Sequence, residues 1–325
     1  MTSIRVLAVA AVLALLGLSV LADVPDGIGA ASYARQPLTA RPAAMGGAFV
    51  SIAEGIPAAY YNPAGLGRHT PFEAGAMYSL PYGEAFDTSL QFLGINGNLG
   101  ELQTDSQMLS KLGWSVGWLG LSIRDIWLWD DDGAPTIASA NSSLYTASAG
   151  IPIPAIEGLY GGASIKVYRD TLLDGRSFGI GLDLGTLLDF VVADIPVSIG
   201  VNAKDIGSTR VKWYGTAGEP DNFVHWVNKF GASARFLSGI VLATADFEWA
   251  VGRPSEEQRA LVGLEVTPVP QLAVRGGWRG SLDGSGGAFT AGVGIYLGET
   301  FRLDYAYRTR RILGAGHTLS VSLVF

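Results

Sequence analysis

Cysteine is absent from this chain of 325 residues, and charged residues make up only 16% of it. Without cysteine, neither a disulfide framework nor a thiolate metal site can form. An ordinary soluble domain carries roughly 25% charged residues. The formal net charge is −7 with no basic block, which argues against binding of nucleic acid. Disorder is excluded, because 48% of the residues are hydrophobic and 8 are tryptophan.

Long apolar runs are also missing after residue 23, where Gly, Ser, Asp or Arg interrupts every stretch. A bundle of membrane helices, with roughly 20 apolar residues in each span, is therefore excluded. The apolar run at residues 6–21 follows Arg5 and ends before Ala22. It is too short for an ordinary membrane anchor and has the layout of a secretory signal peptide. We expect residues 1–22 to be cleaved near Ala22 after export to a bacterial envelope.

Alternation with a period of two is the pattern that replaces helical runs. In residues 178–184, Phe, Ile and Leu alternate with Gly and Asp, as in a β-strand with one apolar face. A soluble β-sandwich also alternates. However, here the polar faces carry Gly and charges of both signs, while large aromatics lie near segment ends, which favours a membrane barrel. The charged residues expected to face the lumen are Lys166, Asp183, Asp246, Glu248, Glu265, Arg275, Arg279, Arg302, Asp304 and Arg308.

The alternating segments number fourteen, so the predicted fold is an all-β, transmembrane antiparallel barrel of about 14 strands, at residues 71–325. Twelve and sixteen strands are the alternatives, and strand ends are uncertain by about three residues. Along the chain, every second link between strands is short, as at 237–239. The link at 96–112 breaks this rule, because it is long and leaves room for a short helix. The strand candidates are 72–79, 88–95, 113–123, 143–151, 159–169, 176–188, 195–204, 224–236, 240–250, 258–267, 271–279, 287–297, 300–308 and 317–325.

Residues 23–70 do not alternate. They contain many small residues, including Gly46 and Gly47, and a cluster of aromatics near Tyr60. This segment is too long for a simple tail and too short for a domain of its own. A barrel of fourteen strands has a lumen wide enough to need filling. We therefore expect residues 23–70 to form a hatch, or plug, inside the lumen.

Two blocks in this segment carry a resemblance to a known family. The sequences of residues 45–50 (MGGAFV) and 58–66 (AAYYNPAGL) resemble the N-terminal signature of the FadL-type outer-membrane barrels, most closely the PorV/PorQ group. Residues 182–185, residues 303–307 and the final Phe325 are similar to later parts of that group. The resemblance spans nearly the whole mature chain. It implies a fourteen-stranded barrel with a hatch whose Asn-Pro-Ala motif, here Asn62, Pro63 and Ala64, controls the passage of hydrophobic substrates.

The candidate site residues each have a second interpretation. Asn62 and Pro63 form either a gate or simply a turn. The lumen charges line a polar path, or they pair with one another and with the hatch and fill the barrel, which we favour. Gly117 and Gly120 permit a kink that opens the barrel wall laterally, as the resemblance suggests, although glycine is frequent throughout the chain. Phe325 is expected to serve as the C-terminal signal for barrel assembly.

Two functions from different classes remain. The first is a hatch-gated passive channel for hydrophobic small molecules. The second, implied by the PorV group, is a partner or shuttle in protein secretion or envelope assembly, with a sealed lumen. Expected partners are outer-membrane lipid, lipopolysaccharide and the barrel-assembly machinery, with a hydrophobic ligand or secretion proteins according to the function. No enzyme motif, cofactor motif or metal-ligand spacing is present in the sequence, so we expect neither an enzyme nor a cofactor nor a metal site.

Overall fold

The protein is described by a computed structural model that covers residues 31–68, 71–83, 87–102, 109–129, 135–216, 220–251, 258–282, 286–310 and 314–325. The predicted signal peptide at residues 1–22 and the first eight residues of the predicted hatch lie outside the described residues. Among the residues described, no helix is long and apolar enough to cross a bilayer.

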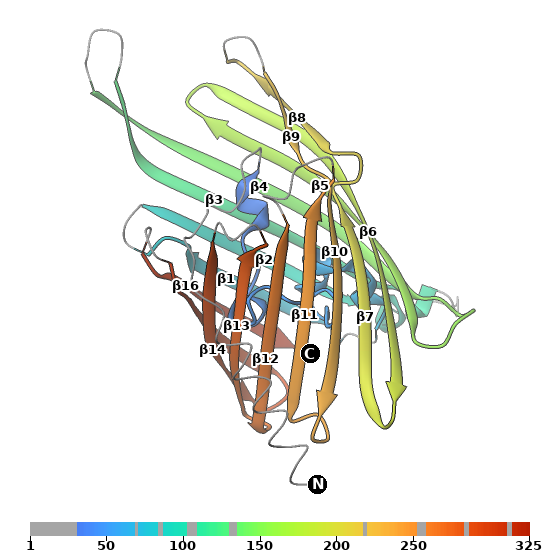
Figure 1. Cartoon of the computed structure of the whole chain (residues 1–325). Coiled ribbons are helices and arrows are strands. Elements are labelled where there is room, and N and C mark those ends of the chain that lie inside the picture. Colours follow the sequence, from blue (N-terminus) through green and yellow to red (C-terminus); the bar gives the residue numbers. More distant parts are fainter. Residues whose placement is uncertain are drawn as a thin grey trace.

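Fourteen antiparallel strands close into a barrel, which confirms the predicted fold class and strand count (Figure 1). Each barrel strand pairs with its neighbours on both sides, β1 with β16 and β5 with β6 included. The barrel strands are β1 (Glu73–Leu80), β2 (Thr88–Asn98), β3 (Gly113–Trp129), β4 (Pro135–Pro152), β5 (Leu159–Leu172), β6 (Gly175–Val192), β7 (Ile195–Lys204), β10 (Val227–Phe236), β11 (Val241–Ala250), β12 (Arg259–Val269), β13 (Leu272–Ser281), β14 (Gly287–Leu297), β15 (Phe301–Arg308) and β16 (Gly316–Val324).

A hairpin outside the barrel corrects one prediction. The stretch between the predicted strands 195–204 and 224–236 was left as a link, but it contains β8 (Thr209–Tyr214), and β9 (Asp221–Val224) ends at the first residue of the second predicted strand. Strand β6 has 18 residues and β7 has only 10, so the outer part of β6 would present an open edge. β8 covers that edge, pairing Val211 with Gly179 and Tyr214 with Arg176.

Strands β3 and β4 are longer than predicted, because they continue as a two-stranded ribbon beyond the barrel (Figure 1). β3 pairs with β2 only as far as Ile123, and β4 pairs with β5 only from Ala140 onward. A register shift between Ile123 and Ile126 separates the ribbon from the barrel wall. The ribbon's aromatic and small residues lack regular alternation, which is why the period-two pattern did not predict it.

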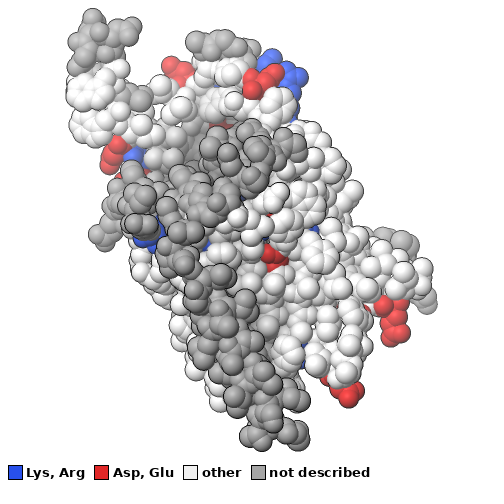
Figure 2. All heavy atoms as spheres, in the orientation of Figure 1, with Lys and Arg blue, Asp and Glu red and all other residues white. Residues whose placement is uncertain are grey.

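The outer surface of the barrel is apolar, which follows from the alternation. Large side chains such as Ile165, Ile180 and Val274 are more than half exposed. Figure 2 shows a largely uncharged middle, with most charged side chains of this face toward the two ends of the barrel. A contiguous apolar surface of this extent is unfavourable in water, so the fold requires apolar surroundings.

The two ends of the barrel differ. One end carries the turns after β6, β10, β12 and β14 and the C-terminal Phe325, and we call it the short-turn end. The link at 96–112 also lies there and contains two short 3₁₀ helices, η3 (Leu99–Leu102) and η4 (Leu109–Lys111), in agreement with the short helix considered for it. The opposite end, which we call the long-loop end, carries the β3–β4 ribbon and the β8–β9 hairpin.

Residues 31–68, which we call the N-terminal segment, pack against the inner face of the wall. The segment contains η1 (Ser32–Arg35), α2 (Ala40–Ala44), α3 (Ala58–Tyr61) and η2 (Pro63–Gly67). Phe49, Tyr61 and Leu66 are almost completely buried and form part of the main hydrophobic cluster. The core of this protein therefore lies between the segment and the wall, with the large outer side chains facing away from it.

Glycines of the wall make room for this segment. Gly113, Gly150, Gly162 and Gly185 are cross-strand partners in a row over β3 to β6. A Cβ atom added to any of them would approach an atom of residues 62–66 to 2.4 Å or less. Such contacts are far inside van der Waals distance, so this part of the wall admits only glycine. Much of the glycine excess in the sequence thus has a steric cause.

Candidate functional site

The Asn-Pro-Ala motif lies where the N-terminal segment meets β6. Asn62 is fully buried, and its Oδ1 accepts a hydrogen bond of 3.2 Å from the Ala64 amide, which caps η2. Its Nδ2 donates to the carbonyl oxygens of Val50, at 3.1 Å, and Thr186, at 2.9 Å. Pro63 starts η2, where its fixed φ suits the helix and its missing N–H costs nothing. Asn62 therefore shapes the turn and also ties the segment to the wall.

Gly46 and Gly47 form the turn that ends α2. Both have positive φ, at 68° and 85°, a backbone conformation that favours glycine. The Gly46 amide donates to Thr290 Oγ1 at 2.9 Å, and a Cβ on Gly46 would lie 2.5 Å from the Trp278 carbonyl oxygen. The chain thus passes against β13 and β14 at a distance that a side chain would prevent.

The predicted lumen charges lie on inward-facing positions, and most are buried. Lys166 Nζ lies 2.7 Å from Asp183 Oδ1 and 2.6 Å from Asp205 Oδ2. Asp246 Oδ2 accepts hydrogen bonds from the amides of Phe49 and Val50, at 2.7 and 3.0 Å. Of the other predicted lumen residues, Glu248 pairs with Lys229, and Arg308 donates to Gln36. Arg279 is buried on β13, whereas Arg302 is exposed at the short-turn end.

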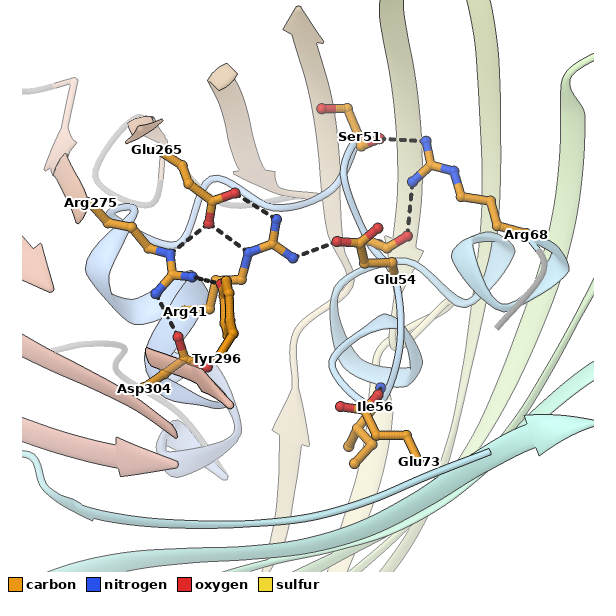
Figure 3. Close-up of polar contacts among 11 residues, drawn as sticks. Arg41, Ser51, Glu54, Ile56, Arg68, Glu73, Glu265, Arg275, Tyr296 and Asp304 are labelled. Carbon is orange, nitrogen blue, oxygen red and sulfur yellow. Dashed lines mark hydrogen bonds and ion pairs between the residues drawn. The ribbon is translucent and has the colours of Figure 1, made fainter. Parts of the chain in front are cut away.

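A network of charges joins the N-terminal segment to β12–β15 (Figure 3). Arg41 lies 2.8 Å from Glu265 and 2.5 Å from Glu54. Arg275 lies 2.6 Å from both Glu265 and Asp304, and it also donates to the Tyr296 hydroxyl. Two of the three acidic groups in this network, Glu265 and Asp304, were predicted lumen residues. Arg41 lies in the non-alternating segment, so no sequence pattern predicted that it would pair with Glu265.

A second ion pair, between Arg68 and Asp189, holds the C-terminal end of the N-terminal segment. Arg68 donates to both carboxylate oxygens of Asp189 on β6, at 2.9 and 2.5 Å. Its remaining donors reach the carbonyl oxygens of Ala53 and Ser51, at 3.0 and 3.1 Å. Arg68 and Asp189 were not singled out from the sequence, because neither belongs to a motif and their pairing depends on the path of the segment.

Arg41 and its acidic partner Glu54 keep each other ionised. Burial would raise the pKa of the Glu54 carboxyl, but the Arg41 guanidinium outweighs this effect and holds the pKa below its usual value. Burial would lower the pKa of Arg41, whereas Glu265 and Glu54 raise it well above its ordinary value. The Arg41–Glu54 pair therefore stays ionised at neutral pH and weakens only as acid protonates Glu54.

A large cavity opens at the short-turn end, between the N-terminal segment and the wall. It has a volume of about 860 Å³, and charged or hydroxyl side chains line much of it, including Arg302, Asp304 and Ser320. A second cavity of about 370 Å³ lies beside β6 and β7, and Glu54 borders both cavities. A cavity of this size, lined by both polar and apolar residues, can hold a small molecule.

The two glycines at which a kink in β3 was predicted lie within continuous strand pairing. Gly117 pairs with Gly94 and Thr146, and Gly120 pairs with Gln91 and Ser143, so the wall is continuous at both positions. Gly120 faces outward beneath the Trp118 ring, which would lie 2.4 Å from an added Cβ. The irregularity of this strand lies nearer its tip, at residues 123–126.

Metal-binding groups do not gather in the part of the chain that the structure describes: no set of three His, Asp or Glu side chains there is placed to hold an ion. Asp130, Asp131 and Asp132, which follow β3 in the sequence, lie outside the described residues.

Comparison with solved structures finds the same architecture in two hydrocarbon channels. The toluene transporter TbuX of Ralstonia pickettii superposes with a TM-score of 0.59 and 14% sequence identity, covering 89% of this chain and 99% of that one. A deletion mutant of the monoaromatic hydrocarbon channel TodX gives 0.57 and 13%, with the same coverage. At such identities the likeness establishes the fold alone. The sequence matches no family profile. It also matches no curated protein.

Proposed function

We propose that this protein is an outer-membrane channel of the FadL type, through which small hydrophobic molecules cross passively, with residues 23–70 as its hatch. The proposal rests chiefly on one observation: a closed fourteen-stranded barrel, shared with two hydrocarbon channels, contains an internal segment bordered by a cavity of about 860 Å³. The apolar outer face supports a membrane location, since only lipid or a covering partner can shield it. PorV/PorQ membership remains a hypothesis from the N-terminal motifs.

Export and insertion complete the proposal. Residues 1–22 would direct the chain across the inner membrane and be cleaved. Phe325, at the short-turn end, packs against the Phe72 ring at a centroid distance of 5.7 Å and would be the residue that the barrel-assembly machinery recognises. In this orientation the short-turn end faces the periplasm, and the long-loop end faces lipopolysaccharide and the outside.

The barrel predicts a simple electrophoretic result. A closed barrel has no free edge and resists detergent at room temperature, so unheated protein should migrate differently from boiled protein on a denaturing gel. A trypsin digest before loading should leave the unheated band largely intact. Identical migration before and after boiling would count against a stably closed barrel.

Transport gives the direct test of the channel. Intact Gram-negative cells that express the chain should accumulate labelled toluene, supplied at low micromolar concentration, at least tenfold faster than cells with an empty vector. A sugar of similar mass is the control solute and should enter equally in both strains. Toluene uptake at the vector rate would contradict the proposed function.

The secretion partner is the second candidate, and the closely packed segment and the exposed ribbon support it. Trp127 and Trp129 on the β3–β4 ribbon are 59% and 68% exposed, as interface residues often are in an isolated subunit. Chemical cross-linking in envelopes should then recover a stoichiometric protein partner, and removing ribbon residues 125–137 should abolish its capture. Recovery of the chain alone would argue against this candidate.

A further inference from the structure

The β8–β9 hairpin continues the barrel wall beyond the end of β7. β8 pairs with the outer part of β6, and β9 pairs with β8. Val211 and Val224, on the inner face of the hairpin, are buried, and at its base the Trp226 amide donates to Ser208 Oγ at 3.2 Å. The hairpin is therefore held in a fixed place, and its other face points away from the barrel interior.

Cross-strand pairing identifies the side chains on this outward face. Residues that lie directly opposite each other in an antiparallel pair point to the same face of the sheet. Arg176 of β6 is opposite Tyr214, and Phe178 is opposite Lys212. Phe178 and Tyr214 are exposed, which marks their face as the outer one. Arg210 lies two residues before Lys212 on β8 and points the same way, so three cationic side chains share this face with aromatic rings.

The neighbouring strand β5 adds a fourth cation. Arg169 is exposed on β5, two residues before Thr171, which is the cross-strand partner of Arg176. Arg169 and Lys212 therefore lie on either side of β6, two strand spacings or about 10 Å apart. We call this group of four side chains the basic patch; its members are Arg169, Arg176, Arg210 and Lys212.

The outer surface has few cations elsewhere. Figure 2 shows Lys and Arg side chains over the β8–β9 hairpin, at the long-loop end. On the barrel strands, as far as the structure describes them, the remaining Lys and Arg residues face inward, apart from Arg124 at the base of the ribbon. Two acidic residues lie near the patch: Asp221 pairs with Arg210 at 2.5 Å, and Asp174 is exposed in the turn between β5 and β6. Four cations against two carboxylates leave the patch positively charged.

The patch begins where the apolar surface of the wall ends. On β6, the outward side chains of Ile180, Leu182 and Leu184 are exposed and apolar. Phe178 follows Ile180 on the same face, and Arg176 comes next, four residues from Ile180. In outer-membrane barrels an apolar band about 25 Å tall is flanked by aromatic residues at the level of the lipid headgroups. With the long-loop end outside, the basic patch therefore lies at the headgroups of the outer leaflet.

We propose that the basic patch is a binding site for lipopolysaccharide, with the phosphates of lipid A on Arg169, Arg176 and Lys212 and the acyl chains along the apolar wall of β5 and β6. Guanidinium groups bind phosphate through paired N–H donors, and lysine adds a point charge. Cations spread over about 10 Å suit a headgroup with two phosphates better than one with a single phosphodiester. The inference rests on the proposed outer-membrane location and orientation, and is independent of what the barrel transports.

Titration of the purified barrel in detergent micelles with lipid A that carries two phosphates, followed by native mass spectrometry, tests the site. The double variant Arg169→Gln with Arg176→Gln should bind lipid A at least tenfold more weakly than the wild type. Arg124→Gln with Arg302→Gln removes two exposed cations outside the patch and should bind within twofold of the wild type. All four side chains are exposed, so the barrel should fold in both variants, and the migration shift on boiling verifies this.

Two lipids with a single phosphate, monophosphoryl lipid A and phosphatidylglycerol, should bind the wild type at least fivefold more weakly than lipid A with two phosphates. Equal binding of all three lipids would show a surface that takes any anionic lipid and would overturn the assignment to lipopolysaccharide. Equal weakening by both double variants, or by neither, would overturn the location of the site. Each of these results leaves the proposed channel in place, whereas toluene uptake at the vector rate contradicts the channel and leaves the lipid site in place.

Discussion

Replacing Gly277 with alanine is expected to destabilise the barrel by about 3 kcal/mol, the upper part of the usual range for overpacking. Gly277 faces inward on β13, where an added Cβ would lie 2.4 Å from the Gly46 nitrogen and from the Met45 carbonyl carbon. Both are backbone atoms, so no side-chain rotation can relieve the contact. The segment has to lift away from β13 and strain its hydrogen bond to Thr290.

The adjacent residue provides a matched control. Gly276 lies on the same strand but faces outward, and the nearest atom to an added Cβ is the Thr290 carbonyl oxygen at 4.0 Å. Gly276→Ala should therefore leave stability unchanged or raise it by about 0.5 kcal/mol, since alanine restricts the unfolded chain. Urea unfolding in detergent micelles, followed by tryptophan fluorescence, measures both variants. Equal effects at the two positions would mean that the segment is not pressed against this wall.

The barrel was predictable because alternation is a local property. Each strand shows its apolar face in its own sequence, so fourteen strands could be counted and most ends placed within three residues. The β8–β9 hairpin was not predictable in this way, since it exists to cover the part of β6 that the shorter β7 leaves open. The unequal lengths become visible only when the register is known.

The inner site was predictable in its composition but not in its pairing. Inward alternation identified Asp246 and Glu265 as lumen residues, yet their partners, the amides of Phe49 and Val50 and the side chain of Arg41, come from a segment without periodicity. No local pattern determines where such a segment meets the wall. The glycine excess similarly indicated a filled interior, whereas the row of glycines over β3–β6 depends on the cross-strand register.

Replacing Lys166 with methionine is expected to destabilise the protein by about 3–5 kcal/mol, the usual cost of removing one partner from a buried ion pair. Lys166 is only 3% exposed and lies between Asp183 and Asp205, so its loss leaves two buried carboxylates without their cation. Methionine keeps most of the volume, so the effect isolates the charge. The same urea titration measures the loss.

The position of Asp205 gives this variant a second, local effect. Asp205 begins the link from β7 to β8; its amide donates to Asp183 Oδ1 at 2.8 Å, and its carboxylate accepts from Tyr168 and Thr209 at 2.9 Å each. Repulsion between the two carboxylates should loosen this link, so limited proteolysis between residues 205 and 226 should accelerate in Lys166→Met. Arg210→Met is the control, because its pair with Asp221 is exposed on the hairpin and should contribute nothing measurable to global stability.

Neutralising the Asp183 and Asp205 carboxylates separates the effect of the lost charge on stability from the effect of lost packing. Adding Asp183→Asn and Asp205→Asn to Lys166→Met removes the uncompensated charges and should restore a large part of the lost stability, since a buried site without charge avoids the desolvation cost. A triple variant as unstable as Lys166→Met alone would instead show that packing and hydrogen bonds around Lys166, not its charge, hold the link between β7 and the outer hairpin in place.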